Sequence, residues 1–262
     1  MSLEIERETP FRVSSVVPFL ASLWIIGGVY IILILSLLIA DASYSTPSHF
    51  LKALQSEEIR YAIKLSLVSC TMAAILSLWV AIPIGYLMSR YDFRGKIFFD
   101  AILDIPIVLP PLVIGLSLLI LFQTPIGRAI ESKVTITYGI PAVILAQFMV
   151  ACAFAVRAMR VSFDQLDPRQ EQVALTLGCN RNRAFWLVVL PEVRHGILTA
   201  ATLAWSRSLG EFGPILIFAG ATRMRTEVLP TTVFLELSIG NVEAAVAVSL
   251  LMVFAAMIVL VI

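Results

Sequence analysis

The stretch that decides the fold lies at residues 171–197 and reads EQVALTLGCNRNRAFWLVVLPEVRHGI. It is polar and carries several arginines, yet strongly apolar runs precede and follow it. Gly178 divides its first part, and a Leu-Pro pair at Leu190 and Pro191 ends its apolar second part. A polar insert of this kind between two long apolar runs is typical of a loop that joins two membrane-spanning helices.

The composition of the whole chain agrees with a membrane protein. Of its 262 residues, 59% are hydrophobic and only 14% are charged, whereas a soluble domain has about 25% charged residues. Several apolar runs have the length of about 20 residues that crosses a hydrocarbon core. We therefore predict an all-α membrane protein that forms a single transmembrane domain over residues 1–262. Its six predicted spans are residues 18–40, 61–88, 98–122, 140–159, 197–219 and 244–262.

The first and the last of these apolar runs each permit an expectation. The first run is longer than the 7–15 apolar residues of a secretory signal, so we expect a retained anchor. The sixth run reaches the last residue without a polar tail, which leaves open a longer natural chain.

The three cysteines show no spacing typical of disulfide frameworks or zinc sites. The net charge of +1 gives no reason to expect a nucleic-acid partner.

The distribution of lysine and arginine predicts the orientation in the cell membrane. One set of connecting segments carries eleven of these residues and the other set carries six. The positive-inside rule places the richer set in the cytoplasm, together with both termini and the insert at residues 160–196. The cytoplasmic set consists of Arg7, Arg12, Arg90, Arg94, Lys96, Arg157, Arg160, Arg169, Arg181, Arg183 and Arg194.

The insert contains the signals of two short helices. Asp167 can cap the first helix, and Pro168 suits its first position. Gly178 fits the left-handed residue that ends a helix. Asn180 can cap the second helix, and we expect Pro191 to break it and to open the fifth span. These signals predict a helix–turn–helix on the cytoplasmic face.

The faces of these two helices suggest a contact with another protein. Val173, Ala174 and Leu177 share one face of the first helix. The small residues Ala174 and Gly178 would let a partner's backbone approach closely, and Arg181 suits acidic partners or lipid head groups. The residues alone leave a second interpretation open, an ordinary loop that lies on the lipid surface.

At this point the chain resembles a known family. Residues 171–178 and 188–191 are similar to the EAA signature of importer-type ABC permeases, in which glycine and Leu-Pro keep a fixed spacing. Glu171 stands one position before the usual glutamate, a shift that resembles the molybdate/tungstate branch. The resemblance implies the fold of a type I importer permease, with a coupling helix that seats in a groove of an ATPase subunit. It assigns coupling to Glu171, Ala174, Leu177, Gly178, Arg181, Leu190 and Pro191.

Two further stretches resemble molybdate- and sulfate-type permeases. Residues 104–119 read DIPIVLPPLVIGLSLL, and residues 205–213 read WSRSLGEFG. Taken alone, the first is equally well a kinked packing helix. The second could be a neutralising pair of Arg207 and Glu211, which stand four residues apart. In the family the fifth span lines the translocation path. The expected pathway residues are Pro110, Pro111, Ser206, Ser208, Gly210, Glu211, Phe212 and Gly213.

Charged residues beside these stretches have plainer expected roles. Asp100 and Asp104 lie one helical turn apart, and we expect them to cap helix ends, because acids would repel an anion. Arg223 and Arg225 follow the fifth span on the outer side, where they suit either a contact with a receptor protein or a solvated rim.

The remaining expectations concern partners and chemistry. The chain lacks the G-x-x-x-x-G-K-[ST] loop that cradles phosphates, so we expect no ATPase site, no enzymatic activity, no metal and no cofactor on this chain. The resemblance implies ATP and magnesium on two partner ATPase subunits, an identical second permease chain, an extracytoplasmic substrate-binding protein and a lipid bilayer. It implies import of an oxyanion, molybdate or tungstate first, by alternating access. The alternatives are a sulfate or thiosulfate permease, an ATP-independent secondary transporter and a membrane-embedded enzyme.

Overall fold

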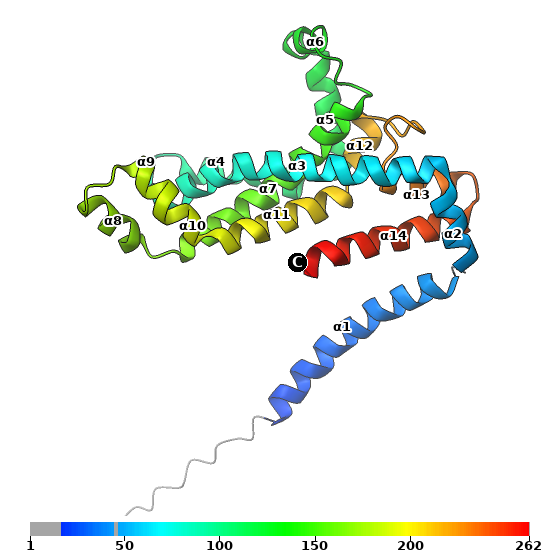
Figure 1. Ribbon diagram of the computed structural model, residues 1–262, viewed down its shortest axis with the longest axis horizontal. Helices are drawn as coiled ribbons and strands as arrows, with labels where there is room; N and C mark the ends of the chain where they lie inside the picture. The colour runs from blue at the N-terminus through cyan, green and yellow to red at the C-terminus, as the bar shows by residue number, and fades with distance from the viewer. Residues whose placement is uncertain (1–16, 45–46, 262) are drawn as a thin grey trace, which may run out of the picture. The chain divides into compact units, whose positions relative to one another are not determined.

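The computed structural model describes residues 17–44 and 47–261, and every regular element in these two ranges is helical (Figure 1). The chain divides into two units, Met1–Tyr44 and Ser45–Ile262. In the first unit, α1 (Val17–Tyr44) is one long apolar helix whose side chains are almost all exposed. It covers the predicted first span and continues to Tyr44. Arg7, Arg12 and Ile262, which the predicted orientation and sixth span include, lie outside the described residues.

The centre of the second unit is formed by three long helices, α3 (Glu57–Arg90), α7 (Ile140–Gln165) and α11 (Arg194–Leu209), which lie side by side (Figure 1). The buried face of α3 consists largely of alanine, serine and glycine, and the buried face of α7 includes five alanines. Small side chains allow helix backbones to approach closely where lipid provides no hydrophobic driving force between them. This packing explains why apolar helices of ordinary membrane-spanning length form one body.

The other helices surround this centre or extend from it. At one end of α3 lie the short helices of the insert, and at the other end lie α2 and α13 (Figure 1). The helices outside the centre are α2 (Pro47–Gln55), α4 (Lys96–Val108), α5 (Pro111–Gln123), α6 (Pro125–Glu131), α8 (Pro168–Thr176), α9 (Arg181–Ala184), the π-helical turn η1 (Phe185–Val189), α10 (Leu190–Glu192), α12 (Gly213–Phe218), α13 (Leu229–Ser238) and α14 (Val242–Val261).

The predicted third span is not one helix. It consists of α4 and α5, whose axes differ by 110°. The cause is the pair Pro110-Pro111. A residue before proline is driven out of the helical region, and Leu109 and Pro110 are accordingly extended, with ψ of 139° and 134°. Pro111 then occupies the first turn of α5, where its missing N–H is no loss.

The predicted fifth span is also interrupted. α11 ends at Leu209, and the shorter α12 begins at Gly213. Pro214 explains the break, because its ring would clash with the carbonyl four residues earlier, that of Gly210. By length and composition, four helices among the described residues could cross a membrane, α1, α3, α7 and α14, or up to six if each bent pair counts as one span.

The fourth predicted span ends too early. α7 continues six residues beyond residue 159, so Arg160, like Arg157, stands on the helix and not in the connecting loop. There they bind the acids of α4: Asp104 accepts from Arg157 Nε at 2.7 Å, and Asp100 binds Arg160. The expectation that these two aspartates cap helix ends is therefore wrong. They connect α4 to the end of α7.

Candidate functional site

The first helix of the insert, α8, begins and ends as its sequence predicts. Asp167 Oδ1 accepts a hydrogen bond from the Arg169 backbone N–H at 2.9 Å, and Pro168 takes the first helical position. Gly178 has φ of +89°, the left-handed conformation that glycine adopts without steric cost. Cys179 N–H then reaches back to the carbonyl of Ala174 at 3.1 Å. The elbow, which we define as residues 167–193, thus starts as a rigid short helix with a defined stop.

The second helix of the elbow differs from the prediction in where it ends. Asn180 caps it, since Asn180 Oδ1 accepts from Arg183 N–H at 2.8 Å. Pro191 does not break it directly. Because Pro191 has no N–H, the helix widens into the π-helical turn η1 just before it, and the break follows at Val193. The helical segment Arg181–Glu192 and α11 then differ in direction by 70°.

The faces of the elbow are divided differently from the expected single apolar face. Ala174 is buried against the chain itself, as is Ala184, so Ala174 offers no surface to a partner. Val173 and Leu177 point outward, and Leu177 is 80% exposed. Trp186 and Leu187 on η1 are also exposed. The large apolar side chains that the elbow exposes are therefore Val173, Leu177, Trp186 and Leu187.

Glu171 lies on the opposite, inward side of α8, where it attaches the elbow to α3. Tyr86 donates its phenolic hydrogen to Glu171 Oε1 at 2.6 Å. Arg90 Nε lies 3.8 Å from Glu171 Oε2, and Arg90 Nη2 donates to the carbonyl of Leu166 at 3.0 Å. The Tyr86 ring also meets the edge of Phe163 on α7, with 5.6 Å between centroids. This cluster links α3, α7 and α8.

Arg181 makes a second contact between the elbow and the end of α3. Its Nη1 donates to the Tyr91 hydroxyl at 2.7 Å, so this arginine is bound to the chain itself. Sequence reasoning assigned Arg181 but missed Tyr86 and Tyr91. Neither tyrosine belongs to a motif, and only the folding of α8 back onto α3 brings them to the elbow.

The two stretches predicted to form the pathway, residues 104–119 and 205–213, meet at a cavity away from the elbow. A cavity of about 310 Å³ lies between the start of α5 and the break between α11 and α12. Six of the eight predicted pathway residues line it, and Leu112 and Arg207 complete the lining. The six are Pro110, Pro111, Gly210, Glu211, Phe212 and Gly213.

Two glycines permit the close approach of α5 and α12 around this cavity. A Cβ atom on Gly115 would lie 2.8 Å from Cα of Pro214, closer than real contacts allow. A Cβ atom on Gly213 would lie 3.1 Å from the backbone nitrogen of Leu112. The sequence prediction assigned Gly213 to the pathway, whereas Gly115, which belongs to the quoted stretch 104–119, was not among the predicted pathway residues.

The other two predicted pathway residues do not line this cavity. Ser206 donates to the carbonyl of Thr202 on its own helix. Ser208 is fully buried and donates to the carbonyl of Ala204 at 2.8 Å, and its own carbonyl accepts from Gln147 Nε2 at 3.2 Å. Ser208 therefore contributes to the contact between α11 and α7.

The predicted pair of Arg207 and Glu211 is confirmed. Arg207 Nη2 lies 2.7 Å from Glu211 Oε1. Glu211 is 1% exposed, whereas the Arg207 side chain is 34% exposed. Ionisable groups inside membranes face a bundle interior or a cavity because the hydrocarbon does not solvate them. Both of these side chains line the cavity.

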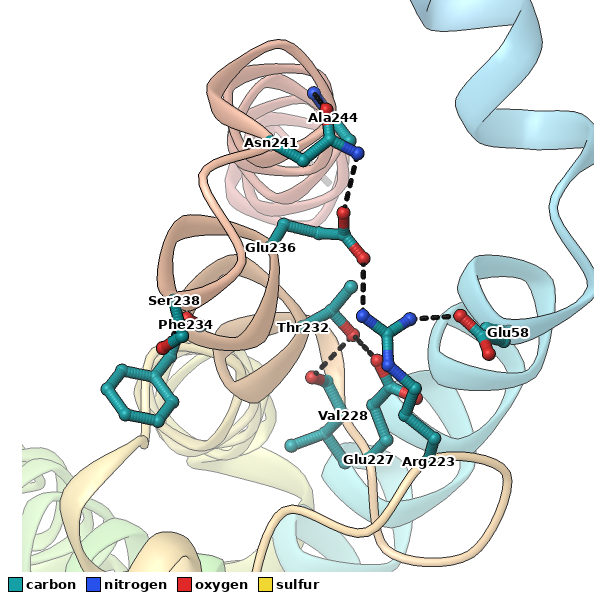
Figure 2. A network of polar contacts seen from close by, with 10 residues as sticks. All are labelled: Glu58, Arg223, Glu227, Val228, Thr232, Phe234, Glu236, Ser238, Asn241 and Ala244. Atoms are coloured by element: carbon teal, nitrogen blue, oxygen red, sulfur yellow. Dashed lines mark hydrogen bonds and ion pairs between the residues drawn. The ribbon is translucent and has the colours of Figure 1, made fainter.

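A polar network at the other end of α3 surrounds Arg223, as Figure 2 shows. Arg223 binds Glu58 at the start of α3 and donates from Nη2 to Glu236 Oε1 on α13 at 2.8 Å. Asn241, just before α14, donates to the second oxygen of Glu236 at 2.7 Å. Arg223 thus holds α3, α13 and the start of α14 together, while 30% of its side chain stays exposed.

The same network contains a buried acid, Glu227. Thr232 donates its hydroxyl hydrogen to Glu227 Oε1 at 3.0 Å. Glu227 is fully buried, and burial raises the pKa of its carboxyl group above the ordinary value because the charged form loses hydration. The hydrogen bond from Thr232 acts in the opposite direction. Within the described part of the chain, no group of three or more His, Cys, Asp or Glu side chains could hold a metal ion.

Comparison with known proteins gives one consistent family. The profile of a family described as "Binding-protein-dependent transport system inner membrane component" matches residues 81–262. The molybdate/tungstate transport system permease protein of Pyrococcus abyssi is 37% identical over 158 residues, which are 60% of this chain and 60% of that protein. The molybdenum transport system permease protein of Escherichia coli is 33% identical over 190 residues, 71% of this chain and 83% of that one.

Sulfate permeases and solved transporter structures are also similar to the chain. The sulfate transport system permease protein of Salmonella typhimurium is 29% identical over 222 residues, 84% of this chain and 80% of that protein. A chain of a bacterial alginate ABC transporter, crystallised with an alginate pentasaccharide-bound periplasmic protein, superposes with a TM-score of 0.72. That match covers 93% of this chain and 91% of the other at 16% identity, so it establishes the fold alone.

Proposed function

Because the chain belongs to the family of binding-protein-dependent transport system inner membrane components, we propose that it is the membrane-spanning subunit of an ATP-driven ABC importer for oxyanions. Molybdate and tungstate are the first candidates. The relative at 37% identity is named as a molybdate/tungstate permease, and the relative at 33% identity is named as a molybdenum permease. Family membership also argues against an ATP-independent transporter and against an enzyme.

The observation that carries this proposal is the construction of the elbow. It presents an exposed apolar surface on one side, while Glu171 on the other side is bound by Tyr86 at the end of α3. An element that is fixed to the bundle and apolar on its free face is suited to dock a partner and to transmit its movement. Rigid-body closure of a partner can then move α3, α7 and α11 as a unit.

The proposed complex contains two copies of this chain, two ATPase subunits that bind ATP and magnesium, and an extracytoplasmic binding protein. The elbow and both termini face the cytoplasm, and the network around Arg223 faces the outside of the cell membrane. ATP binding draws the two elbows together and opens the pathway outward, the binding protein releases its anion into it, and hydrolysis returns the pathway to the inward state. The side chains of Glu171, Leu177 and Arg181 serve coupling, directly or by holding the elbow.

Uptake by the reconstituted transporter tests this proposal. The complex of this chain with its ATPase and binding protein is placed in lipid vesicles, and uptake of tungstate is measured with and without ATP. We expect ATP-dependent accumulation of tungstate that excess molybdate suppresses. Equal accumulation without ATP, or no accumulation of any oxyanion, would contradict the proposal.

Sulfate import is the second candidate. The similarity to the sulfate permease extends over 84% of this chain, more than either of the molybdenum-related alignments reported above. The same vesicles distinguish the two substrates, because a sulfate transporter would accumulate labelled sulfate and leave tungstate outside.

A further inference from the structure

The cavity between α5 and the break after α11 holds one basic side chain, Arg207, among the residues that line it. About a third of this side chain is exposed, while its partner Glu211 is almost completely enclosed. The arginine is therefore the member of the pair that a small solute entering the cavity would reach. Its charge has the sign that attracts an oxyanion.

The guanidinium group of Arg207 retains donors for such a solute. Arginine has five N–H donors, and its fork geometry matches two oxygens of a tetrahedral anion. In the described contacts Nη2 binds Glu211, and Cζ lies 5.5 Å from the ring centroid of Phe154. The carboxylate and the ring hold the plane of the guanidinium while its remaining N–H groups stay available.

The start of α5 adds to the attraction at the same cavity. Pro110, Pro111 and Leu112 belong to its lining, and the N–H of Leu112 lies in the first helical turn, where the helix itself supplies no acceptor. The amino end of a helix carries a partial positive charge. This dipole assists Arg207, whose full charge is the stronger attraction.

Glu211 keeps the affinity of Arg207 for an anion low, as transport requires. Without a counter-charge, an arginine at this depth would be costly in the empty state. With the carboxylate beside it, the same arginine attracts an anion while Glu211 repels it. Conduction needs binding that is favourable enough for entry and weak enough for release.

We propose that Arg207 is the residue that contacts the oxyanion during its passage, and that Glu211 is a positioning residue that keeps this contact weak. This inference rests on the proposed function and specifies one contact within it. The competing explanation is that the two side chains only neutralise each other inside the bundle.

A double variant separates the two explanations. The complete transporter is reconstituted with Arg207→Gln, with Arg207→Lys and with Arg207→Gln combined with Glu211→Gln, and tungstate uptake is measured beside ATPase activity stimulated by the binding protein. We expect Arg207→Gln to lower uptake at least tenfold, Arg207→Lys to retain part of it, and the double variant to stay as low as Arg207→Gln. Arg157→Gln is the matched control, since it removes an ion-paired arginine that does not line this cavity, and it should leave uptake within about twofold.

The results that would overturn the inference are equally defined. Recovery of uptake in the double variant would mean that only charge neutrality mattered, and unchanged uptake in Arg207→Gln would mean that no contact is made. If Arg207→Gln also loses stimulated ATPase activity, the uptake of the other two variants is compared. Partial uptake in Arg207→Lys beside low uptake in the double variant supports the inference, and recovered uptake in the double variant overturns it. A wild-type transporter that imports no oxyanion overturns the proposed function and the inference together. A wild type that imports tungstate beside a recovered double variant overturns the inference alone.

Discussion

Single carboxylates differ across this molecule because their neighbours differ. Glu171 receives a hydroxyl hydrogen from Tyr86 and lies near Arg90. Glu236 has a guanidinium on one oxygen and an amide on the other. Glu227 is fully enclosed, and it accepts a hydrogen bond from the hydroxyl of Thr232. A buried carboxylate that lacks a directly bound cation is costly when ionised.

The raised pKa of Glu227 predicts a pH-dependent stability. A folded-state pKa above the ordinary value of 4.5 means that the folded protein binds this proton more readily than the unfolded chain. The stabilisation from the protonated group is complete below 4.5 and is lost as pH rises through the folded pKa. Glu227→Gln removes this loss, so the variant should unfold at a higher temperature than wild type at pH 8, with no difference at pH 4. Each unit by which the pKa is raised corresponds to about 1.4 kcal/mol of stability lost at high pH. Thermal unfolding of the purified complex at both pH values measures the difference between the variant and wild type.

Glu236→Gln provides the contrasting control. It removes the charge that Arg223 binds and should lower the unfolding temperature at pH 8, because a partly buried cation then loses one of its two carboxylates. A Glu227→Gln variant that is destabilised at pH 8 to the same extent would contradict the explanation by burial.

At the scale of the element, the elbow combines a fixed face and a free face on helices of only a few turns. Ala174 and Ala184 are buried against the chain, whereas Val173 and Leu177 are exposed one helical turn apart. Exposed apolar pairs of this kind cost little alone but mark an interaction surface when other apolar side chains adjoin them. Trp186 on η1 is a further exposed apolar side chain of the elbow.

Leu177→Glu tests this surface. Burying a leucine at an interface is worth roughly 1.5–3 kcal/mol, and a charge in its place would add a desolvation cost. We expect the affinity of the ATPase subunit for the permease to fall at least tenfold, measured by co-purification over a concentration series. Leu237→Glu is the matched control, since Leu237 is an equally apolar exposed residue on α13 at the other end of the bundle. Equal losses in both variants would show that the charge acts through general damage.

At the scale of the whole molecule, α3 connects the two functional ends. It holds Glu58 of the Arg223 network at its start and Tyr86 and Arg90 of the elbow near its end. A straight helix of 34 residues is about 51 Å long, enough to cross a membrane and extend beyond it. Movement imposed on the elbow can therefore reach the opposite surface along one continuous helix.

Tyr86→Phe is predicted to uncouple the two activities. The change removes the hydroxyl that binds Glu171 while the ring can keep its contacts with Phe163 and Phe185. We expect ATPase activity to persist while the amount of tungstate imported per ATP falls severalfold, because the elbow moves without moving α3 fully. Both quantities are measured in the same vesicles.

Tyr61→Phe is the control for that experiment on the same helix. Its hydroxyl donates to the carbonyl of Arg225 at 3.1 Å, far from the elbow. It should leave the import-to-ATP ratio near the wild-type value. A matching fall in both variants would argue against a specific role of the Tyr86–Glu171 bond.

The sequence by itself determined the features that depend on short-range physics. Runs of apolar residues specified membrane helices, and Asp167, Gly178 and Asn180 specified the caps and the turn of the elbow because these signals act within a few residues. The Gly and Leu-Pro spacing identified the family. Arg207 and Glu211 were paired correctly since four residues on a helix bring them to one face.

Only the tertiary structure decided where the chain turns and which distant residues meet. The spans at 98–122 and 197–219 read as continuous apolar runs, yet the first bends by 110° between α4 and α5, and the second is interrupted between α11 and α12. Ala174 was assigned to a partner and proved to be covered by its own chain. Tyr86 reaches Glu171 across 85 positions of sequence. Such contacts are set by how helices pack, and local sequence carries no record of them.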